Sequence, residues 1–167
     1  SALAANITTS ADCAAMAAAA RERFGAIDIV VNNVGIGGGG AGPAHKLTEE
    51  AFDRILAVNL KGAWQVSKAV LPTLREQGKG SIVNISSLAS IAGGGQTAYE
   101  ISKAALNRLT TSVAQANAGK GVRCNAIAMG LLDTPMAVAG IAAASGQEQQ
   151  AVREARNARV PLGGQMG

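Results

Sequence analysis

The residues with the clearest capacity for chemistry lie in the stretch TAYEISKAAL, residues 97–106, which holds the only tyrosine of the chain, Tyr99. Lys103 follows four residues later, a spacing that puts both side chains on one face of a helix. A free phenol titrates near about 10 and is a poor acid or base at neutral pH, but a neighbouring cation favours its ionised form. Such a phenol exchanges a proton with a carbonyl or alcohol oxygen. The pair predicts acid–base chemistry at that oxygen, and the alternative is a half-buried spacer beside a solvated lysine.

Further polar and glycine residues follow three strand-like runs. They are Asn32-Asn33-Val34-Gly35, Ser86-Ser87 and Met129-Gly130 with Thr134. Helical connections return a parallel sheet's chain to the same edge, so we expect these groups to meet at one rim, where ligands of such sheets bind. A serine there can hold the substrate oxygen, and the partner reaction is hydride transfer, which requires a cofactor because no side chain carries it out.

Asn59 occupies the apolar stripe of a predicted helix. An amide in that position costs about 1–3 kcal/mol if its hydrogen bonds are unmet. The sequence therefore predicts specific partners for it.

Strand-like and helical segments alternate along the chain, and no hairpin dipeptide joins two strands, which favours a parallel sheet. We predict an α/β fold, a doubly wound parallel sheet of Rossmann-like type, in one domain spanning residues 1–167. Ser10 is the predicted cap of the first helix, and Trp64 is predicted to lie in the core. The expected strands cover residues 1–7, 27–32, 81–86 and 122–127, and the expected helices residues 10–24, 48–75, 98–118 and 147–157.

Composition narrows the function. The chain has 167 residues, of which 48% are hydrophobic and 16% charged, enough to build a core. Its net charge of +4 is scattered, without the basic stripe and stacking aromatics of a nucleic-acid binder. No apolar run reaches the roughly 20 residues of a membrane helix. Cys13 and Cys124 lack metal-ligand spacing, so we expect two reduced thiols, no metal and a cytoplasmic location.

The motifs together, in this order, resemble the classical short-chain dehydrogenase/reductase family, and the resemblance covers essentially the whole chain. They are Asn32-Asn33-Val34-Gly35, Asn59-Leu60-Lys61-Gly62, Ile85-Ser86-Ser87, Tyr99-Glu100-Ile101-Ser102-Lys103 and Gly130 with Thr134. The resemblance implies an oxidoreductase that interconverts an alcohol and a ketone or aldehyde, with NAD or NADP as cofactor. It also implies a homodimer or homotetramer that packs through the tyrosine-bearing helix.

The resemblance also implies roles for single residues. Tyr99 would be the acid/base, and Lys103 would lower its pKa and bind the nicotinamide ribose. Ser87 would orient the substrate oxygen, although Ser86 gives the commoner spacing to the tyrosine. Asn59 would hold a water in a proton relay. The implied cofactor-binding residues are Asn6, Asn32, Gly35, Tyr99, Lys103, Gly130 and Thr134.

Departures from the family pattern are also visible. Val34 replaces the usual alanine, Met129 stands where a proline is usual, and Asn6 stands where an aspartate often contacts adenine. The glycine-rich pyrophosphate turn, a second strand that selects NAD or NADP, and the final helix and strand are not present, so we expect an incomplete domain. Two alternatives stay open, namely a non-catalytic fragment or assembly module of the same fold and, with less support, a sugar-nucleotide epimerase.

Overall fold

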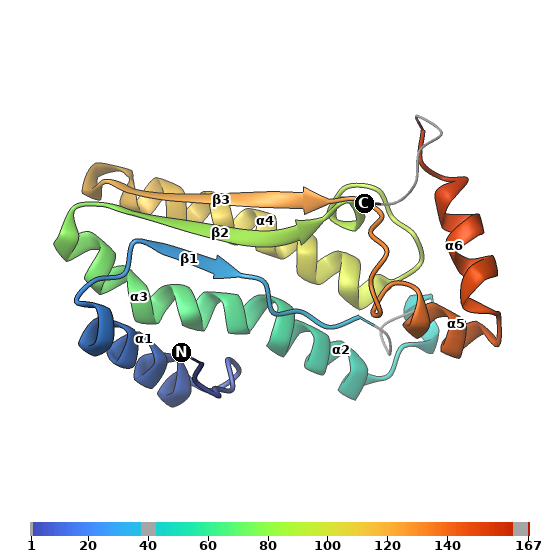
Figure 1. Ribbon diagram of the computed structural model, residues 1–167, viewed down its shortest axis with the longest axis horizontal. Helices are drawn as coiled ribbons and strands as arrows, with labels where there is room; N and C mark the ends of the chain where they lie inside the picture. Colours follow the sequence, from blue (N-terminus) through green and yellow to red (C-terminus); the bar gives the residue numbers. More distant parts are fainter. Residues whose placement is uncertain (1, 38–42, 162–166) are drawn as a thin grey trace.

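The structure is a computed structural model that describes residues 2–37, 43–161 and 167. Within these residues, three strands and six α-helices follow one another, and Figure 1 shows how they are arranged. The strands are β1 (Ile29–Asn32), β2 (Gly80–Ser87) and β3 (Val122–Met129), and the helices are α1 (Ser10–Phe24), α2 (Glu49–Leu56), α3 (Ala63–Gln77), α4 (Thr97–Asn117), α5 (Ala139–Ser145) and α6 (Gln149–Asn157).

The sheet is parallel throughout, in the order β1-β2-β3, which confirms the predicted fold class. Val30 pairs with Ile82, and Ile82 pairs with Cys124, so these three side chains share one face of the sheet. All three strands point toward α5 and α6, which lie beyond their carboxyl ends (Figure 1). The rim at which ligands of such sheets bind is therefore the end of the sheet nearest α5 and α6.

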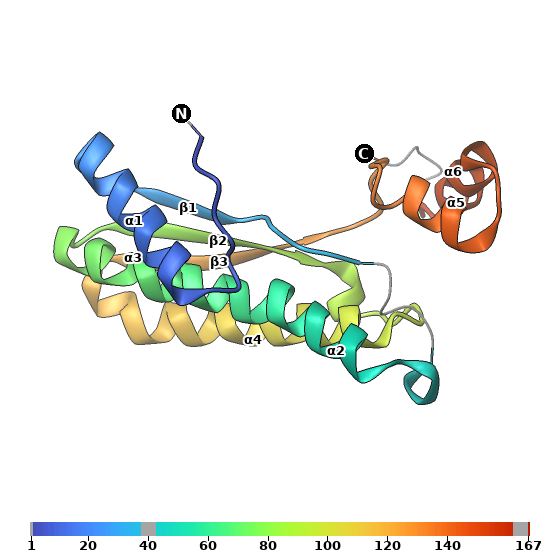
Figure 2. The ribbon, with the colours of Figure 1, turned by 90° about the horizontal axis from the view of Figure 1, so that it is seen from below.

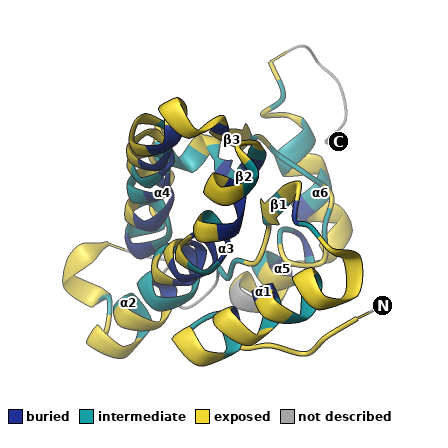
Figure 3. Cartoon of the chain, turned by 90° about the vertical axis from the view of Figure 1, so that its left-hand side faces the viewer, coloured by how far each residue is buried: buried dark blue, intermediate teal, exposed yellow. Residues whose placement is uncertain are grey.

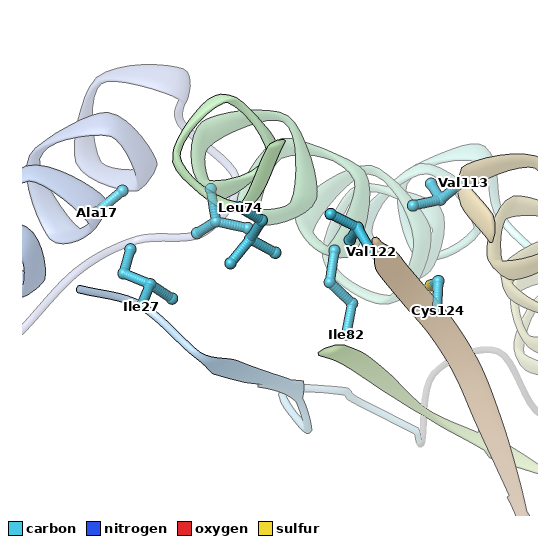
Figure 4. Packing of buried hydrophobic residues seen from close by; sticks show 8 residues of the cluster. Ala17, Ile27, Leu74, Ile82, Val113, Val122 and Cys124 are labelled. Carbon is cyan, nitrogen blue, oxygen red and sulfur yellow. The ribbon is translucent and has the colours of Figure 1, made fainter. Parts of the chain in front are cut away.

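One face of the sheet is covered by helices α1, α3 and α4 (Figures 2 and 3). Between them lies the main hydrophobic core, seen in Figure 4. Leu74 and Ile82 are fully buried there. The core members are Ala17, Ile27, Val70, Leu74, Ile82, Val113, Val122 and Cys124. Burial of such aliphatic side chains contributes roughly 1.5–3 kcal/mol each, so this layer anchors α4 against β2 and β3.

Apolar side chains on the other face remain open to solvent. Ile29 is 68% exposed, Val31 57% and Ile127 51%. In a sheet with side chains alternating between faces, these residues mark the face opposite the helices.

The long helix predicted for residues 48–75 is divided. Helix α2 passes into a π-helical turn, Ala57–Gly62, which leads directly into α3. Single π turns are rare in proteins, and many of those that occur lie at functional sites. Asn59 lies inside this turn and is buried.

Several local predictions were wrong. The described part of the predicted first strand, residues 2–7, is not a strand, because no neighbouring strand supplies its hydrogen bonds; the backbone N–H of Asn6 instead donates to Asp12 at 2.8 Å. Ser1 lies outside the described residues. Thr9, not Ser10, caps α1 by accepting from the Asp12 N–H. Trp64 is 43% exposed, and α5 was not foreseen.

In the part of the chain that the structure describes, no helix has the length and apolar character needed to cross a membrane.

Candidate functional site

Tyr99 and Lys103 lie on the first two turns of α4 with their side chains adjacent. The Lys103 Nζ is 5.7 Å from the centre of the Tyr99 ring, within cation–π range. Lys103 is only 4% exposed, and its ammonium donates to the Ile85 carbonyl oxygen of β2 at 2.8 Å. Burial lowers the pKa of Lys103. The predicted shared helix face is therefore present, with the lysine held between helix and sheet.

Gly35 brings the loop after β1 against this pair. A Cβ added at Gly35 would lie 3.4 Å from the Lys103 Nζ and 3.5 Å from the Asn59 Oδ1. Both distances are ordinary van der Waals contacts, so a side chain at position 35 would fill the space that the glycine leaves open beside the lysine and the asparagine.

Asn59 meets its hydrogen-bonding needs by joining two elements. Its Oδ1 accepts from the Ile36 N–H at 2.8 Å, and its Nδ2 donates to the Ile36 carbonyl at 2.9 Å and to the Ser102 Oγ at 3.1 Å. The Ser102 hydroxyl in turn donates to the Tyr99 carbonyl at 2.7 Å. Asn59 thus ties the loop after β1 to the helical turn that carries the tyrosine.

Ser102 is a site residue that the sequence reasoning missed. It is fully buried and connects Asn59 with Tyr99. Its position three residues after Tyr99 puts it on a neighbouring part of the same helical face, so the spacing could have revealed it. The Ile85 carbonyl had no such signal, because backbone groups are the same at every position.

Ser86 and Ser87 differ in burial and in hydrogen bonding. Ser86 is 3% exposed, and its hydroxyl donates to the Lys103 carbonyl at 3.4 Å. Ser87 is half-buried, and its Oγ accepts from the Ala89 N–H at 3.1 Å. The Ser87 hydroxyl proton has no acceptor among the described residues, whereas that of Ser86 is already engaged.

Asn32 faces the helices instead of the rim. Its Nδ2 donates to the Asn84 Oδ1 at 2.8 Å and to the Ser67 Oγ at 3.4 Å. Asn84, which is fully buried, continues the line by donating to the Thr110 Oγ1 at 2.8 Å. This polar line, made of Ser67, Asn32, Asn84 and Thr110, runs through the apolar layer and connects α3, β1, β2 and α4. Each residue of this line takes part in at least one hydrogen bond, as polar residues in an apolar layer generally do.

The remaining predicted cofactor residues occupy other surroundings. The Asn6 Oδ1 accepts from the Thr8 N–H at 3.0 Å, beside the start of α1. Gly130 lies against Leu88, the residue after Ser87, since an added Cβ would be 3.5 Å from its Cδ1. The Thr134 carbonyl accepts from the Ala137 and Val138 N–H groups and closes the turn before α5.

A cavity of about 370 Å³ lies between the loop after β1, helix α2 and the segment after β3. Met136, from the segment after β3, is one of its lining residues, and Arg54 is the charged residue in its lining. Its lining residues are Gly35, Ile36, Gly37, Ala51, Arg54, Ile55, Met136 and Gly140. The chain segments after β1 and β3, far apart in sequence, thus share one hollow beside Gly35.

The chemistry available at this site is that of a phenol, a buried ammonium and a hydroxyl with a free proton. Among the described residues, no group of three His, Cys, Asp or Glu side chains could hold a metal ion. Both cysteines are buried free thiols. Proton transfer to or from a polarised oxygen is therefore the reaction that this set supports.

Comparison with known proteins places these residues in a family. The family model described as enoyl-(acyl carrier protein) reductase matches residues 1–166. Over 134 residues the chain is 48% identical to the 2-(R)-hydroxypropyl-CoM dehydrogenase of Xanthobacter autotrophicus, a match that covers 79% of this chain and 54% of that protein.

Solved structures of dehydrogenases and reductases have the same fold as this chain. Levodione reductase superposes with a TM-score of 0.90 at 33% identity, covering 97% of this chain and 63% of that one. NAD⁺-bound xylitol dehydrogenase superposes with a TM-score of 0.88 at 28% identity, covering 98% of this chain and 66% of that one. The chain therefore belongs to the short-chain dehydrogenase/reductase family of oxidoreductases and spans about half the length of the curated relatives that it matches.

Proposed function

We propose that this chain carries the catalytic residues of an NAD(P)-dependent oxidoreductase that interconverts an alcohol and a ketone or aldehyde. The observation that carries the proposal is the buried Lys103 ammonium, fixed by the Ile85 carbonyl and held 5.7 Å from the ring of Tyr99. With the ammonium fixed beside its ring, Tyr99 serves as the group that gives a proton to, or takes one from, the substrate oxygen.

Ser87 is the serine that we assign to the substrate oxygen. A hydroxyl that polarises a carbonyl must have a free proton and access to the ligand. The Ser87 proton has no acceptor in the described chain and its side chain is half-buried, whereas the Ser86 proton is donated to the Lys103 carbonyl inside the helix–sheet interface. The hydrogen bonding therefore supports Ser87 in the choice that the motif spacing left open.

The residues present fit a nicotinamide dinucleotide. Lys103 has three ammonium protons, and one acceptor, the Ile85 carbonyl, lies within hydrogen-bonding distance in the described chain. The remaining protons suit ribose hydroxyls, and Gly35 leaves space beside them. The cofactor, when bound, supplies or accepts the hydride. NAD⁺ is present in the related xylitol dehydrogenase structure.

The other assignments stay predictions with differing support. Asn59 retains one lone pair on Oδ1 for a water, because both of its N–H groups are donated. Gly130 and Thr134 line the third strand end, as a carboxamide contact requires. The Asn32 amide donates to Asn84 and Ser67, and the Asn6 Oδ1 accepts from Thr8. We therefore expect Asn32 to affect the cofactor site indirectly, through the position of the strands that it joins. The single-domain boundary at 1–167 and the cytoplasmic location also stay predictions.

A second copy of the chain is the partner that we propose besides a small-molecule substrate. A groove of about 560 Å³ runs between α3 and α4, and the exposed Trp64 and the half-buried Leu71 and Leu109 line it. An apolar groove along the tyrosine-bearing helix suits a homodimer, within which a homotetramer can form. The mass of the protein in solution tests this assembly.

The first experiment is a titration with NADH and with NADPH, followed by nicotinamide fluorescence, in wild type and in Tyr99→Phe. We expect saturable binding by both proteins and a loss of alcohol oxidation of roughly 10²- to 10⁴-fold in the variant, since it lacks only the acid/base hydroxyl. Absence of binding by a folded wild-type chain would favour the non-catalytic alternative.

A further inference from the structure

Residues 88–96 connect the proposed substrate serine, Ser87, with the proposed acid/base, Tyr99. Most of this loop is exposed, and it contains three consecutive glycines, 93–95. Ser87 is the last residue of β2 and pairs with Met129 of β3, so its backbone is set by the sheet on that side. Its hydroxyl oxygen accepts from the Ala89 N–H, so the direction of the hydroxyl depends on how the loop leaves the strand. Two side chains of α4, Asn107 and Glu100, hold the loop.

Asn107 holds the beginning of the loop through Ser90. The Asn107 Nδ2 donates to the Ser90 Oγ at 2.8 Å, and the Ser90 hydroxyl donates to the Ser87 carbonyl at 2.6 Å. Asn107 lies four residues after Lys103 and eight after Tyr99, so all three follow one face of α4. The relay therefore joins the backbone of Ser87 to the helix face that carries Tyr99.

The direction of this relay follows from proton counting. A serine hydroxyl has one proton, and the Ser90 proton is given to the Ser87 carbonyl, so the Ser90 oxygen only accepts from Asn107. That requires the amide nitrogen of Asn107, and not its oxygen, to face Ser90. As a result, the buried Asn107 Oδ1 has no hydrogen-bond partner among the described residues.

An unpaired buried oxygen is unfavourable, and local rules of this kind are broken mainly at functional sites. An apolar side chain at position 107 would remove the unpaired atom but would also remove the donor. The donor to Ser90 is therefore the property that accounts for an asparagine here.

Glu100 holds the end of the loop. One of its carboxylate oxygens, Oε1, accepts from the Gly94 N–H at 2.6 Å and from the Gln96 N–H at 2.8 Å. These backbone hydrogen bonds lower the pKa of Glu100. Gly93 lies beside the same carboxylate, since a Cβ added to it would make an ordinary contact of 3.4 Å with the other oxygen, Oε2.

We infer that Asn107, acting through Ser90, and Glu100 are positioning residues that fix residues 88–96 on α4 and thereby set the Ser87 hydroxyl relative to Tyr99. The inference rests on the proposed function for its catalytic meaning. Neither residue touches the reacting atoms; each acts through the loop.

The structural half of the inference is tested without a substrate, by amide hydrogen exchange. The reporters are the N–H groups of Ala89, Ile91 and Ala92, which are bonded inside the turn at the start of the loop. Ser90→Ala and Asn107→Asp should speed their exchange roughly 2- to 10-fold, the equivalent of one lost hydrogen bond. Asn107→Asp keeps the shape but takes the Ser90 proton, which reverses the relay. Unchanged exchange in both variants would overturn the inference.

The catalytic half is tested by alcohol oxidation with cyclohexanol, isopropanol and benzyl alcohol. Ser90→Ala and Asn107→Asp should lower kcat about 10- to 100-fold through misplacement of Ser87, with the KM of the nicotinamide cofactor unchanged. Ser90→Thr, which keeps the hydroxyl, should restore the rate. Glu100→Gln should show a smaller loss. The matched control is Thr111→Val, whose hydroxyl bonds only within its own helix, to Arg108.

A double variant separates positioning from a general structural effect. If Ser90 acts through Ser87, then Ser90→Ala should cost nothing further in a Ser87→Ala background, whereas independent effects would multiply. Multiplying effects would overturn the inference. Full activity of Tyr99→Phe would instead overturn the proposed function, and the exchange experiment would still decide whether the loop is held.

Discussion

Val30 and Val31 are neighbours in β1, yet they have opposite surroundings. Val30 packs against the main hydrophobic core, whereas Val31 is 57% exposed on the face that the described helices leave uncovered. The same contrast appears across the sheet, where Ile82 is fully buried and Ile127 is 51% exposed. Aliphatic residues occur on both faces, so an aliphatic side chain does not by itself identify the covered face.

The difference lies in what the covered face carries in addition. The polar line of Ser67, Asn32, Asn84 and Thr110 crosses it, and the hydrogen bond from Lys103 to Ile85 lies at its carboxyl end. Helix α4 is therefore held against the sheet by both apolar packing and directional bonds. Packing alone permits sliding, whereas hydrogen bonds set the axial position of a helix, and catalysis requires that position to be set to within a fraction of an ångström.

The largest expected difference between the faces is in stability. Ile82→Ala should lower the free energy of unfolding by about 2–5 kcal/mol, because it leaves a cavity in a closed core. Ile127→Ala removes the same atoms from the exposed face and should change the free energy of unfolding by about 0.5 kcal/mol or less. Urea unfolding, followed by the fluorescence of the single tryptophan, measures both. Equal losses would mean that the face carrying Ile127 is also covered in solution.

A smaller effect is expected from the polar line. Thr110→Val removes the acceptor of the buried Asn84 amide and should cost about 1–3 kcal/mol. Thr111→Val makes the same chemical change one residue later, at an exposed position of the same helix, and should be close to neutral. Thermal unfolding of the two variants compares them directly. If Thr110→Val is also neutral, the polar line does not stabilise the packing of α4.

The smallest effect concerns the buried ammonium. Burial lowers the pKa of Lys103 in the folded state, so the folded protein releases this proton at a lower pH than the unfolded chain. The penalty for burying the charge is full below the folded pKa and disappears as pH rises through the range up to the ordinary lysine value. Lys103→Met should therefore unfold at higher urea than wild type near neutral pH, and the gap should narrow at alkaline pH. A gap that is constant with pH would contradict the assignment.

Much of the site could be predicted from the sequence because its signals are local. The four-residue spacing of Tyr99 and Lys103 determines their shared helix face, and an asparagine on an apolar stripe predicts buried partners. The parallel sheet followed from alternating strand and helix patterns. The predicted first strand was wrong over its described residues, 2–7, because a strand forms only beside a neighbouring strand. Trp64 was misplaced because helical spacing identifies a stripe and not the element that covers it.

The sequence by itself determined which reactive groups are available to this protein: one phenol, a lysine one helical turn away, and serine and glycine residues at the ends of strands. The tertiary structure decided which of these groups are already engaged in hydrogen bonds. The proton of Ser86 is donated to the Lys103 carbonyl, the Asn32 amide joins the polar line, and Asn107 and Glu100 hold the loop between Ser87 and Tyr99. Hydrogen bonds between residues far apart in sequence depend on how helices and strands pack, and no periodicity along the chain records that packing.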